Sequence, residues 1–226
     1  MGEVHGLPAV SRAIIAVAVV VWVAELLTRN MGADSVLARG ALQAGLIADG
    51  EWWRIVTTGF LHDDRLPTGL LHVGFNMYFL YFLGQMLEPT LGRLRFTVAF
   101  FVSLLGGSLG ALLLSPDRYT VGASGAVFGL IAVALVELRS RGIPPMRTPL
   151  ATILILNLFI TFGFARFISV GAHLGGLVAG GLVGYLLFEV GRARRSRRTP
   201  VLAASVGLGV ALAVGSIAVA LSAGGA

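Results

Sequence analysis

The sequence alternates between long apolar runs and short polar connections. Seven runs have roughly the 17 to 25 residues that an α-helix needs to cross a bilayer. They predict membrane-spanning helices over 12–28, 69–88, 94–114, 122–138, 149–166, 169–190 and 200–222. Arg12 precedes the first run and no small-residue cleavage site follows it, so we interpret this run as a retained helix rather than a secretory signal. We therefore expect an all-α fold, a polytopic helical bundle in a membrane.

The longest connection covers about residues 29–68 and mixes tryptophans with charged residues, Gly and Pro. This composition is typical of a structured or interfacial loop. No second globular domain is visible. We expect a six-helix core over 1–190, followed over 191–226 by an arginine-rich loop and an additional transmembrane helix.

The composition agrees with a membrane protein and excludes some kinds of functional site. Of the 226 residues 56% are hydrophobic and 12% are charged, and the mean hydropathy is +0.87, which leaves too little polar surface for a soluble protein. There is no cysteine, so disulfides, thiolate metal sites and a cysteine nucleophile are excluded. The net charge of +6 rests on arginine, because lysine is absent. These arginines cluster between apolar runs, which indicates membrane topology rather than a nucleic-acid partner.

The arginines also predict the orientation. With a cytoplasmic N-terminus, eleven of the seventeen arginines fall on the cytoplasmic side. The short connections decide the matter, because the loop at 190–199 holds five arginines and the loop at 166–169 holds one. Seven spans then place the C-terminus outside the cytoplasm.

Unusual polar residues occupy one layer of the predicted bundle. The second, fourth and sixth spans enter from the outer face, and their polar side chains lie within about 10 Å of it at about 1.5 Å per residue. Ionisable groups at such depth usually face the protein interior and indicate function. The residues of this layer are His72, Asn76, Ser124 and His173.

A ridge of small residues predicts which helices approach closely. In the sixth span a small residue recurs at every fourth position, and such a ridge can pack against small residues of the fourth span. The ridge is Ala172, Gly176, Gly180 and Gly184, and the facing pair is Gly125 and Gly129. This packing would bring the imidazole of His173 toward Ser124. A serine becomes a useful nucleophile when a base within hydrogen-bond reach takes its proton.

A third member for this pair is not evident from the sequence. Glu137 lies about 20 Å below Ser124 at about 1.5 Å per residue, and Glu189 is similarly remote from His173. The depths of Asp117 and Glu25 are compatible with such a role. We favour a Ser/His dyad.

Two further features of the site follow. Phe128, one turn below Ser124, can orient the imidazole by stacking. The oxyanion can be stabilised by His72, Asn76 and the backbone N–H of Ser124. His72 and Asn76 are four residues apart and so share one face of their helix.

Simpler interpretations exist for each residue. Ser124 can be one more small packing residue, His173 a structural histidine, Asn76 a hydrogen bond between helices and His62 a plain loop residue. For the whole chain the alternatives are a catalytically inactive binding scaffold and a small transporter. A transporter usually places its site near the midplane and often has internal repeats. No repeat is visible here.

Four ordered motifs resemble the signature of the rhomboid family of intramembrane serine proteases. They are Trp53-Arg54, His72-x-x-x-Asn76, Gly122-Ala123-Ser124-Gly125 and Ala172-His173-x-x-Gly176. The resemblance spans about residues 50–185 and implies a six-helix rhomboid-like core with one added helix. Some members have tyrosine where this chain has Phe128, so stacking is retained without the hydroxyl.

The resemblance also implies a function. The chain would hydrolyse transmembrane segments of other proteins near the outer face of a bacterial cytoplasmic membrane, with no metal and no cofactor. Ser124 would be the nucleophile, His173 the base, and His72 and Asn76 the oxyanion donors. Arg54 would have a structural role in the first loop, and Glu88 one at the opposite end of the bundle. The partners would be the lipid bilayer and transmembrane protein substrates.

The orientation can be tested with single cysteines, because the chain has none. We expect Asp117→Cys to react with an impermeant thiol reagent in intact cells and Ser140→Cys to react only after lysis. Labelling of position 140 but not of position 117 in intact cells would reverse the topology.

Overall fold

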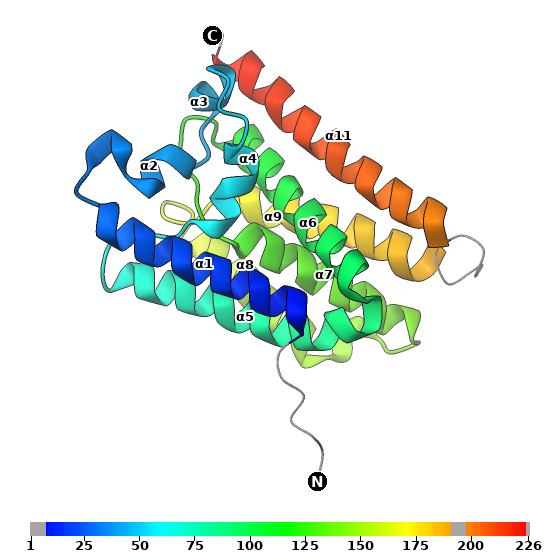
Figure 1. Ribbon diagram of the computed structural model, residues 1–226. Helices are drawn as coiled ribbons and strands as arrows, with labels where there is room; N and C mark the ends of the chain where they lie inside the picture. Colours follow the sequence, from blue (N-terminus) through cyan, green and yellow to red (C-terminus); the bar gives the residue numbers. More distant parts are fainter. Residues whose placement is uncertain (1–7, 191–197, 225–226) are drawn as a thin grey trace.

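The described part of the chain is built from helices. A computed structural model describes residues 8–190 and 198–224 (Figure 1). Within these ranges, five helices are long and apolar enough to cross a membrane. They are α1 (Ala9–Thr28), α5 (Thr68–Leu91), α6 (Arg93–Leu114), α9 (Val170–Tyr185) with its π-helical extension η4 (Leu186–Val190), and α11 (Arg198–Gly224). The predicted all-α membrane bundle is confirmed.

The other two predicted spans form helices that are shorter than these five. They are α7 (Ser124–Ser140) and α8 (Pro149–Gly163), of 17 and 15 residues. Helix α7 begins at Ser124 rather than at 122 because Gly122 has φ +125°, outside the helical region. Helix α8 ends three residues early, where Phe167 N–H donates to the carbonyl of Phe164 in a turn. Most of the predicted arginine-rich loop, residues 191–197, lies outside the described residues.

The first connection folds into a compact series of short helices. These are η1 (Gly32–Asp34), α2 (Val36–Gly40), α3 (Ala44–Ala48), α4 (Arg54–Thr57) and η2 (Thr58–Phe60). An antiparallel bridge joins Leu42 to Thr120, and Gly122 N–H donates to the carbonyl of Thr58. The prediction of a structured loop is correct, and the loop is tied to the segment that leads into α7. On the other side of α7, a single turn, η3 (Pro145–Arg147), precedes α8.

Helix α9 packs against both α6 and α7 near the centre of the bundle (Figure 1). On the α7 side, a Cβ added at Gly176 would lie 2.0 Å from the carbonyl oxygen of Gly125, and one at Gly180 would lie 2.2 Å from that of Gly129. The small-residue ridge therefore packs on α7 as its spacing predicts. Only residues without a side chain allow backbones to come this close.

A second glycine contact joins α9 to α6. A Cβ at Gly171 would lie 2.1 Å from the carbonyl oxygen of Gly110, and one at Gly175 would lie 2.2 Å from that of Gly106. The sequence interpretation did not anticipate this second contact. Helix α9 is thus held by backbone-to-backbone packing on two faces.

The carboxylate of Glu88 joins α5 to the start of α1. It accepts hydrogen bonds from the backbone N–H groups of Val10 and Ser11, at 3.0 and 2.8 Å, and from the hydroxyl of Ser11 at 2.7 Å. The first N–H groups of a helix have no partner within the helix, and a negative charge there is favourable. Glu88 therefore caps α1 at the end of the bundle opposite Ser124.

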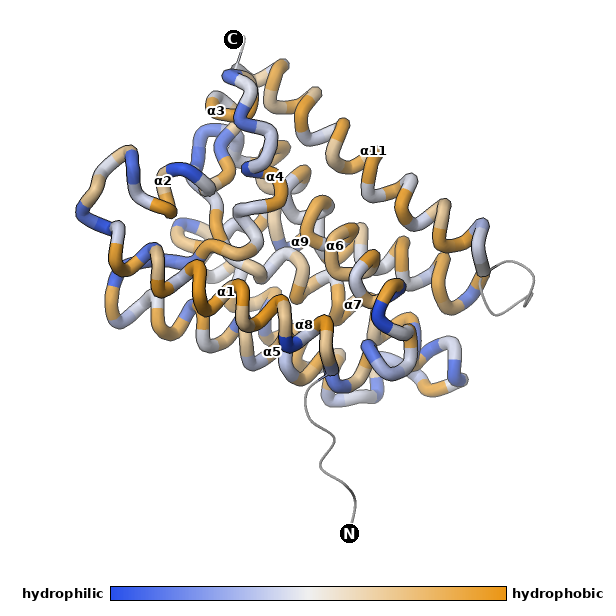
Figure 2. Tube along the Cα trace, in the orientation of Figure 1, coloured by the Kyte–Doolittle hydropathy of each residue, from blue (hydrophilic) through white to orange (hydrophobic). Residues whose placement is uncertain are grey.

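Helix α11 runs along the outside of α6 and reaches α3 at its far end (Figure 1). Gly209 faces Val102 and Leu105, and Gly224 faces Ala48. Figure 2 shows hydrophobic residues along the long helices and hydrophilic ones mainly in the segments that connect them. This distribution fits helices that lie in a bilayer.

Two glycines of α9 offer a matched test of the central packing. Gly176→Ala would push a methyl group into the backbone of α7, which cannot move aside as a side chain can. Gly181→Ala would meet open space, because nothing lies within 4 Å of its Cβ position. We expect Gly176→Ala to lower the melting temperature in detergent and Gly181→Ala to leave it unchanged or slightly higher, since Ala favours helix over Gly. Equal melting temperatures for the two variants would contradict the packing.

Candidate active site

Ser124 is the first residue of α7 and is partly exposed. Gly122, two residues earlier, turns the chain with a positive φ just before the helix begins. The first N–H groups of a helix have no intrahelical partner and carry a partial positive charge. The Ser124 hydroxyl therefore lies beside backbone donors that can stabilise a negative charge.

The imidazole of His173 meets this hydroxyl. Its Nε2 lies 2.8 Å from Ser124 Oγ, and the residue is 7% exposed. The ring of Phe128 is stacked on the imidazole, with centroids 4.1 Å apart and planes 17° apart. Ser124 and Phe128 are on α7 and His173 is on α9, so the glycine packing of these helices determines the geometry.

A third side chain contacts the other ring nitrogen. Thr161 Oγ1, on α8, lies 2.7 Å from His173 Nδ1 and donates to the carbonyl of Asn157 at 2.7 Å. A threonine hydroxyl has one proton, and a carbonyl can only accept. With the hydroxyl proton directed to the carbonyl, this geometry favours the tautomer in which Nδ1 carries the ring proton and donates it to Thr161. The neutral imidazole then has a free lone pair on Nε2, directed at Ser124.

Sequence reasoning missed Thr161 because it considered only acidic residues as the third member. The four acidic candidates take other positions in the structure. Glu25 accepts the backbone N–H of His62, Glu137 pairs with Arg141, Asp117 is in the loop before α7, and Glu189 is in η4. A threonine in an apolar helix gives little signal by itself, since its hydroxyl commonly bonds to its own helix.

His72 faces the same space as Ser124. A Cβ on Gly122 would lie 2.8 Å from His72 Nε2 and 3.6 Å from Ser124 Oγ. His72 Nδ1 accepts the backbone N–H of Asp63 at 3.4 Å, so a neutral ring has its proton on Nε2. That proton is directed toward the space beside Ser124. Glycine at 122 is required both by its φ and by this lack of room.

Asn76 lies one turn further along α5 and is 5% exposed. Its amide nitrogen donates to the carbonyl of His72 in the same helix at 2.9 Å. An amide NH₂ has two protons, so one remains for another acceptor. Asn76 is thus buried on the helix that carries His72, and the described residues show no hydrogen bond between Asn76 and Ser124 or His173.

His62 is a loop residue, as expected, yet it is fully buried. Its ring packs edge-on against that of His72, with centroids 5.0 Å apart. Burial, with a smaller contribution from the neighbouring His72, lowers the pKa of His62 to about 3. His62 is therefore neutral at physiological pH and supports the His72 ring as an aromatic group.

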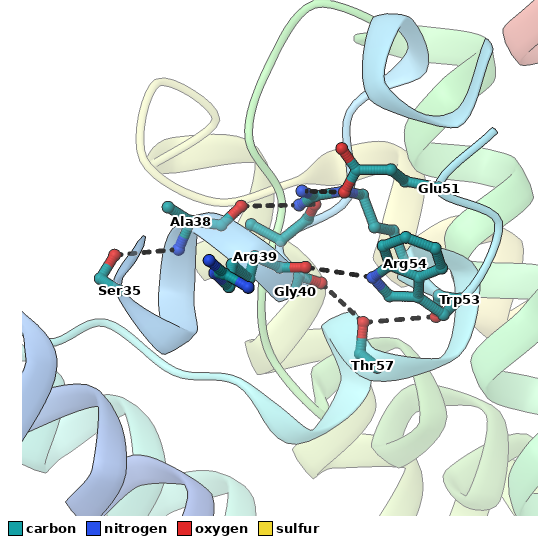
Figure 3. Close-up of polar contacts among 9 residues, drawn as sticks. Ser35, Ala38, Arg39, Gly40, Glu51, Trp53, Arg54 and Thr57 are labelled. Carbon is teal, nitrogen blue, oxygen red and sulfur yellow. Dashed lines mark hydrogen bonds and ion pairs between the residues drawn. The ribbon is translucent and has the colours of Figure 1, made fainter. Parts of the chain in front are cut away.

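Arg54 organises the first loop, and Figure 3 shows its guanidinium among backbone carbonyls and Glu51. Nη1 donates to the carbonyls of Ala38 and Ala41, both at 2.8 Å, and Nε donates to Glu51 at 2.9 Å. The neighbouring Trp53 is 53% exposed, and its indole N–H donates to the carbonyl of Arg39. These two residues thus stabilise the loop at a distance from the Ser124–His173 pair.

A small internal cavity lies behind the first turn of α7. Its volume is about 10 Å³, roughly the size that one water needs. Its lining includes Gly122, Gly125 and the hydroxyl-bearing Thr58 and Ser108. Both hydroxyls donate to backbone carbonyls, Thr58 to that of Thr120 and Ser108 to that of Ile55.

Comparison with known proteins identifies the family. Residues 49–190 match the Rhomboid domain family model. The chain is 38% identical to RHOMBOID-like protein 5 of Arabidopsis thaliana over 153 residues, which cover 66% of this chain and 48% of that protein. It is 36% identical to Rhomboid protease GluP of Bacillus subtilis over 151 residues, which cover 65% of this chain and 28% of that protein.

A third relative, Rhomboid-like protease 1 of Toxoplasma gondii, is 30% identical over 188 residues, which cover 76% of this chain and 62% of that protein. The chain therefore belongs to the rhomboid family, and its apolar helices make it an integral membrane protein. It spans less than two thirds of the length of these relatives.

Two arginines of the first loop allow a matched test of its stability. Arg54→Lys would leave buried carbonyls without a donor, because one ammonium cannot replace the planar guanidinium. We expect a loss of about 1–3 kcal/mol in the free energy of unfolding, measured by thermal denaturation in detergent. Arg39→Lys changes a side chain that is 70% exposed, and its effect should stay within about 0.5 kcal/mol. A neutral Arg54→Lys would contradict the role of Arg54.

Proposed function

We propose that this protein is an intramembrane serine endopeptidase that cleaves transmembrane segments of other membrane proteins. The observation that carries the proposal is the 2.8 Å contact between Ser124 Oγ and His173 Nε2. A hydroxyl next to a free imidazole lone pair is the arrangement required for nucleophilic catalysis. Membership of the rhomboid family supports the same reaction class.

In the first half of the reaction, Ser124 Oγ attacks the carbonyl carbon of a peptide bond while His173 Nε2 takes the hydroxyl proton. The negative charge on the carbonyl oxygen is stabilised by the N–H groups at the start of α7 and by His72 Nε2–H. We propose that the second amide proton of Asn76, one turn from His72 on α5, also contributes once substrate is bound. The C–N bond then breaks, and the proton on His173 passes to the leaving amine.

In the second half, water attacks the acyl ester on Ser124 and gives a proton to His173. The C–O bond to Ser124 breaks, the carboxylic acid product leaves, and the proton returns to the serine oxygen. Ser124 is partly exposed, so water can reach the ester. No step needs a metal or an organic cofactor.

The depth of the site limits the substrates. Ser124 lies at the end of the bundle that holds the first loop, and we propose from the arginine distribution that this end faces away from the cytoplasm. A peptide must leave the helical state before its backbone can reach a nucleophile. Segments with Gly or Pro near that membrane face, which open more easily, are the expected substrates.

The domain division is part of the proposal. Residues up to about 190 form the protease core, and α11 is an added helix that stabilises α6 from outside. In the described residues, the side chains around Ser124 come from α5, α7, α8 and α9 and from the first loop, not from α11.

The test compares serine variants in purified protein. We expect Ser124→Ala to leave folding intact, to reduce cleavage of a transmembrane substrate by about 10⁴-fold or more, and to abolish labelling by a fluorophosphonate probe. His173→Ala should have nearly the same effect, and the double variant should be no worse, because the two residues act as a unit. Asn76→Ala should reduce the rate by at most about 10² to 10³-fold.

Ser103→Ala is the matched control. Ser103, in α6, is a buried serine beside a glycine of α7, Gly129, and in the described residues its hydroxyl bonds to its own helix alone. Its loss should leave cleavage unchanged. Substantial cleavage by Ser124→Ala protein, free of host proteases, would remove Ser124 from the mechanism and leave the sequence Gly122–Gly125 as a packing motif.

A further inference from the structure

We infer that Thr161 is a positioning residue, which holds His173 in the tautomer that can act as a base. This inference rests on the proposed function and extends the Ser124–His173 pair to a chain of three side chains. Thr161 acts through the imidazole and does not touch the reacting atoms.

The first support is the direction of the hydrogen bonds. The hydroxyl proton of Thr161 goes to the carbonyl of Asn157, and this leaves only oxygen lone pairs for His173 Nδ1. The reverse tautomer would have a proton on Nε2, pointing at Ser124 Oγ, and a lone pair on Nδ1 facing a lone pair of Thr161. The contact with Thr161 therefore disfavours the tautomer that cannot accept the serine proton.

The second support is the burial of Thr161 on an otherwise exposed stretch of helix. Thr161 is 1% exposed, whereas the adjacent Ile160 and Phe162 are 40% and 57% exposed. A threonine that only bonds to its own helix needs no such burial. Helix α8 therefore directs one hydroxyl to the inside of the bundle at the depth of the His173 ring.

The third support is what surrounds the ring. Its described contacts are Ser124 at Nε2, Thr161 at Nδ1 and Phe128 on its face. Stacking fixes the plane of the ring but does not distinguish one nitrogen from the other. Only the hydrogen bond to Thr161 makes that distinction. A neutral hydroxyl also orients the ring without the negative charge that a carboxylate would place in the membrane, where charge is costly.

The experiment replaces the hydroxyl while keeping the shape. Thr161→Val is nearly isosteric and removes the acceptor, and Thr161→Ala removes it with less volume. Thr161→Ser keeps the hydroxyl and removes only the methyl group. Thr97→Val is the matched control, because the hydroxyl of Thr97 makes the same type of bond to a carbonyl of its own helix, Arg93, away from the site.

We expect Thr161→Val and Thr161→Ala to lower kcat about 10- to 100-fold with KM unchanged, the usual effect of losing the partner that orients a functional histidine. Thr161→Ser should recover most of the activity, and Thr97→Val should match the wild type. Folded Val and Ala variants with wild-type kcat would overturn the inference. A folded Thr161→Ser variant as impaired as Thr161→Val would also overturn it.

A spectroscopic measurement separates positioning from general stability. The chain has four histidines, so ¹⁵N-histidine labelling gives few ring signals, and His173→Ala identifies those of His173. We expect the wild-type ring to be protonated at Nδ1 and the Thr161→Val ring to gain the Nε2-protonated form. An unchanged tautomer in Thr161→Val would overturn the inference.

The two proposals can fail separately. If wild-type protein neither cleaves nor reacts with the probe, or if Ser124→Ala protein still cleaves, the proposed function fails. The tautomer measurement needs no activity and still decides whether Thr161 controls the ring. If wild-type protein is active and Thr161→Val retains both the tautomer and kcat, only the role of Thr161 fails.

Discussion

The close approach of α9 to α6 and α7 is the constraint on which the rest of the structure depends. Gly176 and Gly180 meet the backbone of α7, and Gly171 and Gly175 meet the backbone of α6. In a bilayer there is little hydrophobic force between helices, so such packing must rely on close contact. Because His173 lies between these glycines, the position of its ring is determined by backbone packing rather than by flexible side chains.

The second organising feature is the set of polar contacts at the two ends of the bundle. At one end Glu88 caps α1, and at the other Arg54 donates hydrogen bonds to backbone carbonyls of the first loop. Both groups are buried and both have several partners, so they satisfy backbone groups that water cannot reach. Backbone hydrogen bonds also join the first loop to the segment before α7. Thr58 in the loop accepts the N–H of Gly122, and Leu42 in the loop pairs with Thr120.

The site itself combines rigid support with a small number of hydrogen bonds. Phe128 fixes the plane of the His173 ring and Thr161 distinguishes its two nitrogens, while Gly122 leaves room for His72. These side chains come from four helices, and none of them carries a charge as long as the two histidines are neutral. A site without formal charges has a low electrostatic cost inside a membrane.

The sequence by itself determined the helices, the polar layer and one of the two glycine contacts. Length and apolar composition are local properties, and the four-residue spacing of small residues defines a helix face without knowledge of the partner. The membership of the rhomboid family could also be predicted, because its motifs are short and ordered. The exact ends of α7 and α8 were less predictable, since they depend on the φ of Gly122 and on a turn after Gly163.

Only the tertiary structure decided what meets the second nitrogen of His173. Depth left Glu25 and Asp117 open as an acidic third residue, but Glu25 accepts the backbone N–H of His62, and the side chain that meets Nδ1 is the hydroxyl of Thr161. The burial of His62 and the second glycine contact, with α6, could not be predicted from the sequence either. Each depends on how elements distant in the sequence pack, and a threonine, a loop histidine or a glycine pair has no local pattern that reveals its partner.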